Sequence, residues 1–314
     1  MEKKAYFYID DVIWPFRDLT RNRPKSIFDQ HLLGMLKEAH EKYDLKVTIN
    51  CFYRTDYSYG DDEFTLAEMT DAYKAEWEAN SDWLKIGYHS KQEFPDYPLI
   101  NVEYDDMKNE YMRFVNEVKR FAGENILMKS INPHWWPVSK DGCRALADCG
   151  IKLFSCTYGD VKEYNGDPTT IPYGHAFRLL QNRKPESKLF TRPGRDIAVR
   201  NSLCAYNHLT TEESAEITGT FKTIYKEELG IHFKRFGGCG GVCLNTTPLD
   251  EIKGDMERGL GAEYCCSATH EQYAYPEYHA YQPDTKEKIF TMCETYLKNG
   301  YEFFFVDECL DKLE

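Results

Sequence analysis

The sequence has no excess of basic residues, no long apolar run and no apolar leader segment. Its 314 residues carry 52 acidic against 39 basic side chains, and the net charge of −13 repels polyanions, so we expect no nucleic acid partner. No stretch approaches the roughly 20 consecutive apolar residues that cross a bilayer. The first residues lack the apolar segment of a secretory signal. We therefore expect a cytoplasmic protein without a membrane partner.

The eleven cysteines follow neither a disulfide pattern nor a zinc-cluster pattern. Their number is odd, their spacing is irregular, and no CxxC pair occurs in the chain. Cys239 and Cys243 flank a glycine-rich turn, and Cys265 and Cys266 lie inside an apolar run. Structural zinc clusters use tighter pairs. We expect reduced thiols that pack as small hydrophobic side chains.

Short apolar runs alternate with amphipathic stretches, which is the pattern of parallel strands joined by helices. The strand-like runs are residues 5–9, 47–52, 84–88, 126–131, 151–155, 231–236, 264–268 and 301–306. Helical patterns follow at 28–39, 65–80, 107–121, 139–150, from 247 and at 284–300. Prolines and glycines break this rhythm at about 157–208. We expect one α/β domain over residues 1–314, a distorted (β/α)7–8 barrel with a loop-and-hairpin lobe inserted at 157–208.

Polar side chains stand at the ends of several predicted strands. They are Asp10 and Asp11 after the first strand, then His89, His134, His270 and, after the last strand, Asp307. In a barrel of parallel strands the carboxyl ends converge on one face, where the loops build the active site. We therefore expect these side chains to gather around a bound divalent metal.

Each of these residues also has a plainer interpretation. Neighbouring side chains that leave a strand point in different directions, so that one of Asp10 and Asp11 can ligate a metal while the other handles a proton. The plainer interpretation of this pair is a strand-end turn or a helix cap. Glu93 lies four residues after His89, and a helical turn there would bring both to one ion. A solvated surface carboxylate is the alternative. His270 suits a catalytic acid, a metal ligand or a structural histidine.

Aromatic residues near the same strand ends are candidates for substrate contacts. Trp135 and Trp136 are adjacent at a strand exit, so at least one ring must lie near solvent or a pocket, where its flat face suits a sugar. Sealing of the core is the alternative for this pair. Trp14, after the first strand, is a further candidate. Arg195 lies in a predicted turn from which it could reach an anionic group of a substrate.

The chain resembles the polysaccharide deacetylase-like (NodB-homology) superfamily of metal-dependent carbohydrate esterases, whose fold is a distorted (β/α) barrel. The resemblance rests on Tyr8-Ile9-Asp10-Asp11, on His89-Ser90, on His270 after an apolar strand, and on the helix and final strand near the C-terminus. It covers most of the chain apart from 157–208. It implies that Asp10 is the base, that Asp11 and His89 ligate a divalent metal, zinc first, and that His270 protonates the leaving group.

The chain departs from the family pattern at three places. Val12 stands where glycine is usual, and Glu93 stands where the family has its second metal-binding histidine. The arginine-containing third motif is not recognisable, and residues 132–135 occupy its place. Either Glu93 or His134 therefore completes the metal site, or the site is metal-free.

These observations lead to one expected function and two rivals. The expected function is hydrolysis of an N- or O-acyl group on a carbohydrate, with the ion polarising the acyl carbonyl and lowering the pKa of its bound water. Asp10 would accept a proton and His270 would donate one. A glycoside hydrolase would need two carboxylates and no metal. A non-catalytic carbohydrate-binding barrel with a decayed site is the third possibility.

Overall fold

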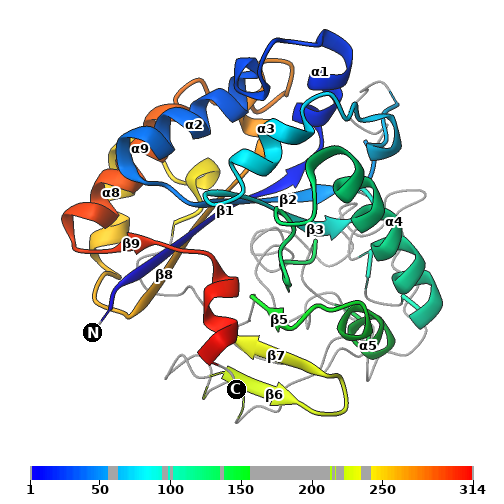
Figure 1. Ribbon diagram of the computed structural model, residues 1–314. Coiled ribbons are helices and arrows are strands. Elements are labelled where there is room, and N and C mark those ends of the chain that lie inside the picture. Colours follow the sequence, from blue (N-terminus) through cyan, green and yellow to red (C-terminus); the bar gives the residue numbers. More distant parts are fainter. Residues whose placement is uncertain are drawn as a thin grey trace, which may run out of the picture.

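The computed structural model describes residues 2–55, 63–93, 98–99, 102–134, 138–155, 213, 216, 223–234 and 242–312. This part of the chain contains two β-sheets. The larger sheet contains β1 (Lys4–Val12), β2 (Val47–Phe52), β3 (Leu84–Ser90), β8 (Tyr264–His270) and β9 (Glu302–Phe303). The smaller contains β4 (Ser130–Ile131), β5 (Leu153–Phe154), β6 (Thr223–Lys226) and β7 (Ile231–Lys234). In Figure 1 the strands of the larger sheet cross the middle, while β5, β6 and β7 of the smaller one lie below them.

Neighbouring strands of both sheets run parallel, with one exception. The larger sheet has the order β3-β2-β1-β8, with β9 beside the start of β1, and the smaller has the order β4-β5-β7-β6, in which β6 alone is antiparallel. Backbone hydrogen bonds from Ile86 to Ile126 and from Met128 to Ile86 join β3 to the segment that leads into β4. The described strands thus follow one another as in a distorted barrel, which confirms the α/β fold class predicted from the sequence.

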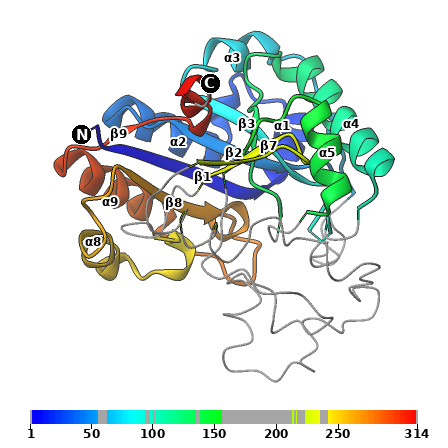
Figure 2. The same ribbon diagram turned by 90° about the horizontal axis from the view of Figure 1, so that it is seen from below.

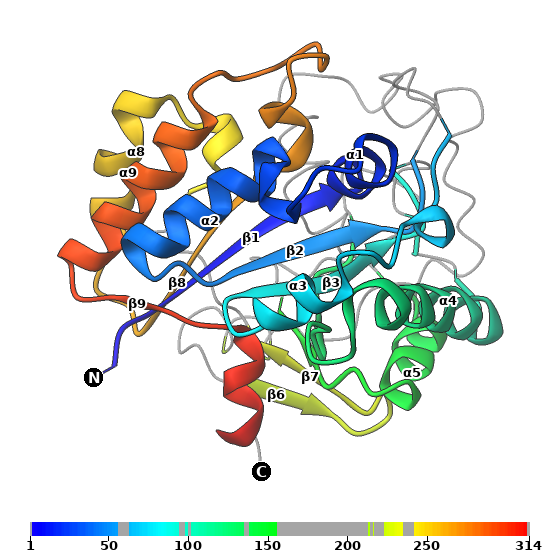
Figure 3. The ribbon, with the colours of Figure 1, turned by 45° about the horizontal axis from the view of Figure 1, so that its top comes forward.

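Helices cover the outside of these strands, as the view from below shows (Figure 2). They are α1 (Trp14–Asn22), α2 (His31–Tyr43), α3 (Lys74–Ala79), α4 (Tyr104–Ala122), α5 (Lys140–Asp148), α8 (Leu249–Glu257) and α9 (Thr285–Lys298). Helices α8, α9 and α2 lie side by side over one part of the larger sheet, and α3, α4 and α5 continue the layer beyond β3 (Figure 3). Within the described ranges, no helix combines the length and the apolar character that a bilayer crossing requires.

The alternation of side chains along β1 explains how a polar site can lie at the end of an apolar strand. Phe7 and Ile9 belong to the large apolar cluster that also contains the helix side chains, whereas Tyr6 and Tyr8 belong to a smaller one with Met128 from before β4. Successive residues of a strand point to opposite faces, so Asp10 continues the row of Tyr6 and Tyr8 toward the inside of the strand array. Both faces of β1 are buried, as expected for a parallel strand with helices outside.

Three sequence-based expectations about elements were wrong. The capping box at Thr65 begins a short 3₁₀ turn, and the predicted helix over 65–80 is reduced to α3 at its end. The last predicted strand is shortened to β9, and a 3₁₀ helix begins at Val306. Asp307 in that helix accepts a hydrogen bond from the backbone N–H of Lys129 at the amino end of β4 (2.6 Å), so it does not join the other strand-end residues.

Helix α1 and the antiparallel strand β6 were not predicted from the sequence. The lobe expected at 157–208 lies outside the described residues.

Two glycine-to-alanine substitutions, one after the end of a helix and one inside a helix, should change the free energy of unfolding in opposite directions. Gly300 terminates α9 with a φ of 79° and has open space around it, so Gly300→Ala should lower the free energy of unfolding by about 1 kcal/mol through backbone strain alone. Gly254 lies inside α8, and a Cβ atom there would meet only the end of the Arg258 side chain, at an ordinary contact distance of 3.9 Å, so Gly254→Ala should raise the free energy of unfolding by about 0.5–1 kcal/mol. Urea denaturation of both variants measures this. Equal effects of one sign would contradict the assignment of Gly300.

Candidate metal centre

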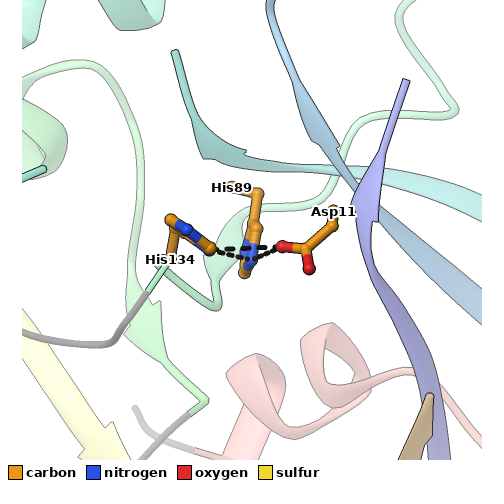
Figure 4. A group of neighbouring side chains, drawn as sticks. All are labelled: Asp11, His89 and His134. Atoms are coloured by element: carbon orange, nitrogen blue, oxygen red, sulfur yellow. Dashed lines mark hydrogen bonds and ion pairs between the residues drawn. The ribbon is translucent and has the colours of Figure 1, made fainter. Parts of the chain in front are cut away.

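Three buried side chains converge at the carboxyl ends of the strands (Figure 4). Asp11 comes from β1, His89 from β3 and His134 from the segment after β4. Asp11 Oδ1 lies 3.2 Å from His89 Nε2 and 3.2 Å from His134 Nδ1, and the two ring nitrogens are 3.1 Å apart. All three residues are at most 5% exposed. Among the described residues, this is the one group of carboxylate, imidazole and thiol side chains that could share a metal ion.

An irregularity in β1 turns Asp11 toward this group. A regular strand would send Asp10 and Asp11 to opposite faces, but the register between β1 and β2 shifts between Ile9 and Val12, and Asp11 has a φ of 64°. Such a left-handed residue costs on the order of 1–3 kcal/mol unless its surroundings hold it, although aspartate tolerates it better than most. Glu271 holds the chain beyond it, because its Oε1 accepts hydrogen bonds from the N–H groups of Ile13 and Trp14, both at 2.9 Å.

Backbone carbonyl groups fix both imidazole rings. His89 Nδ1 lies 2.6 Å from the carbonyl oxygen of Asn132, and His134 Nε2 lies 2.9 Å from that of Glu93. A carbonyl oxygen only accepts, so these two ring nitrogens carry the hydrogens. His89 Nε2 and His134 Nδ1 are left to present lone pairs toward Asp11 Oδ1. Metal-binding histidines are oriented in this way in proteins, and the partner on the other nitrogen selects the tautomer.

The convergence of lone pairs fits a bound cation. Asp11 Oδ1 is fully buried and has no hydrogen bond from the described residues. Ligand atoms about 2.0 Å from a tetrahedral ion are about 3.3 Å apart, and those about 2.1 Å from an octahedral ion are about 3.0 Å apart. The three separations seen here fall between these values. The arrangement therefore fits a small divalent ion without further movement.

The charges around the group favour an ionised carboxylate. Burial would raise the pKa of Asp11, but its contact with His134, the charge of His270 and its contact with His89 outweigh burial and hold that pKa well below its ordinary value. Gln272 Nε2 donates a hydrogen bond to the other oxygen, Oδ2, at 3.1 Å, which leaves Oδ1 for an ion. Burial lowers the pKa of His134, so its ring stays neutral and available for binding.

Asp10 lies beside this group and is held by two asparagine side chains. Asn50 Nδ2 donates to Asp10 Oδ1 at 2.7 Å, and Asn132 Nδ2 lies 3.1 Å and 3.2 Å from its two oxygens. The carboxylate is buried, and burial raises the pKa of Asp10 above its ordinary value, in spite of the opposing charges of His89 and His270. It does not belong to the ligand group. Asp10 is thus a carboxylate with a raised pKa, and it directly precedes the candidate ligand Asp11.

His270 faces the group from the neighbouring strand. It pairs in register with Asp10, its Nδ1 lies 3.0 Å from Asn245 Oδ1, and its Nε2 lies 4.0 Å from Asp11 Oδ2. Burial would lower the pKa of His270, but the charge of Asp11, together with Cys243 and Asp10, raises it to about 10. The imidazole therefore carries a proton at neutral pH, and Asn245 turns its Nε2–H toward the centre.

The remaining predicted site residues are placed differently. His89 and Ser90 belong to β3, so the predicted helical turn that would bring Glu93 to the ion does not form. The Glu93 carboxylate is outside the ligand group and lies 3.4 Å from Gln272 Nε2. Trp14 is 4% exposed and packs edge-on against Tyr275, so its ring lies in the core rather than against a ligand. Trp135, Trp136 and Arg195 lie outside the described residues.

Sequence reasoning missed the amide side chains that organise the centre. The side chains of four amide residues contact the acidic and basic residues above: Asn50, Asn132, Asn245 and Gln272. One signal was present, because Asn50 is, with Thr48, one of two polar residues in the wholly buried strand β2. A polar side chain in such a strand requires a hydrogen-bond partner inside the protein.

No family model matches the chain, and no curated protein matches it. Among solved structures, it is similar to a family 4 acetyl xylan esterase from Clostridium thermocellum in complex with a cobalt ion (12% identity, 99% and 91% of the two chains, TM-score 0.48). It is also similar to a CE4-family pseudoenzyme from Bacillus anthracis (9%, 99% and 66%, TM-score 0.42) and to a 4-alpha-glucanotransferase from Thermococcus litoralis (13%, 99% and 41%, TM-score 0.50). At these identities the likeness concerns the fold.

Replacing single ligands tests the composition of the centre. His134→Ala and His89→Ala should each abolish retention of a divalent ion, because each removes one of three converging donors. Glu93→Gln is the control, and we expect it to retain about one ion per chain, the same content that we expect for the wild type. Elemental analysis after purification without chelators gives the answer. Loss of metal in Glu93→Gln together with retention in His134→Ala would reverse the assignment.

Proposed function

We propose that this protein is a metal-dependent hydrolase that removes an N- or O-acyl group from a carbohydrate, as a divergent member of the polysaccharide deacetylase-like superfamily. The observation that carries the proposal is the three-ligand group of Asp11, His89 and His134 with the buried carboxylate of Asp10 and the imidazole of His270 beside it. Metal-assisted hydrolysis of an acyl group needs these three components in one place. The carbohydrate part of the proposal is supported by the sequence resemblance.

The ion would be held by Asp11, His89 and His134. One carboxylate and two imidazoles suit zinc, and three protein ligands leave a position open for catalysis. When bound, the ion supplies Lewis acidity toward an acyl carbonyl and makes water a better nucleophile at neutral pH. Gln272 and the carbonyl groups of Asn132 and Glu93 keep the three donors aimed at one point.

Asp10 is the residue suited to accept a proton. Its carboxylate is buried next to the ligand group, and its raised pKa brings it closer to the range in which a general base works at neutral pH. Asn50 and Asn132 are uncharged donors, so they orient Asp10 without the strong loss of basicity that a neighbouring guanidinium would cause.

His270 is the residue suited to donate a proton to the departing amine or alcohol. The charge of Asp11 raises the pKa of His270 to about 10, and the His270 Nδ1 lies 3.0 Å from Asn245 Oδ1, so that its Nε2 faces the centre. Asp10 and His270 are neighbours in the register of β1 and β8, so a base and an acid stand on adjacent strands. This spatial separation of acid and base allows both proton transfers of an acyl hydrolysis.

Replacing Asp10 tests the proposed chemistry apart from metal binding. Asp10→Asn should lower kcat for acetate release from N- or O-acetylated oligosaccharides by about 10²–10⁴-fold, because the general base is lost. Its metal content should equal that of the wild type, since Asp10 is not in the ligand group. An Asp10→Asn protein as active as the wild type would remove Asp10 from the mechanism. A wild-type protein that binds metal and oligosaccharide but releases no acyl group would be the non-catalytic barrel.

A further inference from the structure

Asn132 touches both halves of the centre. Its backbone carbonyl oxygen accepts the hydrogen bond from His89 Nδ1, and its side-chain Nδ2 lies 3.1 Å and 3.2 Å from the two oxygens of Asp10. It is 3% exposed, and two residues later the backbone N–H of His134 donates to the carbonyl oxygen of His89 at 2.9 Å. A short segment after β4 thus supplies one candidate ligand, orients a second and contacts the candidate base.

Asn50 contacts Asp10 from β2, which pairs with β1. Its Nδ2 donates to Asp10 Oδ1 at 2.7 Å, and the residue is almost completely buried. Gly87 is its register partner on β3, and a Cβ atom at Gly87 would lie 2.4 Å from Asn50 Oδ1. The absence of a side chain at position 87 therefore makes the room that the Asn50 carboxamide occupies.

The two carboxamides act on Asp10 unequally. Oδ1 accepts from both Asn50 and Asn132, whereas Oδ2 accepts within the described residues only the longer contact from Asn132. An ionised carboxylate oxygen has two lone pairs, so Oδ2 keeps capacity for a proton from a reacting group. Because Oδ1 accepts from Asn50 in β2 and from Asn132 after β4, the rotation of the carboxylate about its Cβ–Cγ bond is fixed.

We propose that Asn50 and Asn132 form a carboxamide clamp whose function is to position Asp10 for proton transfer, with Gly87 required for its closure. This inference rests on the proposed hydrolase function and extends it to residues outside the ligand group. The clamp is specific to the base, because removal of either side chain leaves the three converging donors in place. The carbonyl group of Asn132 that orients His89 belongs to the backbone and survives any substitution of the side chain.

Kinetics with metal analysis separate positioning from general stability. Asn132→Ala and Asn50→Ala should each lower kcat for acetate release by about 10–100-fold, the usual effect of removing a residue that orients a functional group. Their metal content should stay at the wild-type level, and KM should change by less than about twofold, because neither ground-state binding nor the ligands are altered. Gly87→Ala should produce the same pattern, since it displaces the Asn50 carboxamide without removing it.

Asn80→Ala is the matched control. The Asn80 side chain also forms hydrogen bonds, because its Nδ2 donates to the carbonyl oxygen of Glu76 and its Oδ1 accepts from Trp83 Nε1, but it touches no residue of the centre. Asn80→Ala should leave kcat unchanged even if it lowers the thermal midpoint of unfolding. Wild-type kcat in Asn132→Ala, or loss of metal in parallel with kcat, would overturn the clamp. If Asn132→Ala fails to fold, Asn132→Ser takes its place with the same criteria.

Crystal structures of the wild type and Asn132→Ala, each with zinc added, decide the matter independently of activity. We expect the Asp10 carboxylate to rotate or become disordered in the variant while Asp11, His89 and His134 superimpose. If the Asp10 carboxylate has the same orientation in Asn132→Ala as in the wild type, the clamp is refuted, whatever the activities of the two proteins. A wild-type protein without acyl hydrolase activity would refute the proposed function, and the rotation of Asp10 would still show whether the clamp exists.

Discussion

The constraint on which the centre depends is the approach of three electron-rich atoms, Asp11 Oδ1, His89 Nε2 and His134 Nδ1, to within about 3 Å of one another in a buried place. Such atoms repel unless a positive charge lies between them. Burial would lower the pKa of His89, but Asp10 and Asp11 raise it above its ordinary value. The two carboxylates thus favour a positive charge at this position. A metal ion supplies such a charge for all three atoms at once.

The fold supplies the scaffold for this approach through strand register. Parallel pairing of β1 with β8 sets Asp10 beside His270, and pairing of β2 with β3 sets Asn50 beside Gly87. Regular strand geometry alone would turn Asp11 away from Asp10. The left-handed backbone of Asp11 and the anchoring of Ile13 and Trp14 by Glu271 bring both carboxylates to one side. The local irregularity of β1 is therefore part of the site.

Much of the centre was predictable because strand ends can be read from a sequence. The runs before Asp10 and His89 are apolar and end sharply, so their convergence followed from the rule for parallel strands. The choice between Glu93 and His134 could not be made, since it depends on whether a helical turn begins at His89, and β3 instead runs through His89 to Ser90. Asp307 was wrongly included because β9 ends early and the chain turns toward the amino end of β4. Amide side chains carry no spacing pattern, so the clamp became visible only in three dimensions.

The most direct test of this account is a crystal structure of the protein with a divalent ion, with the ion located by its anomalous scattering. We expect one ion bound by Asp11 Oδ1, His89 Nε2 and His134 Nδ1, each at about 2.0–2.2 Å. An ion bound through Glu93 in place of His134 would contradict the ligand assignment. Binding of no ion at all, with these three side chains turned away from one another, would contradict the account as a whole.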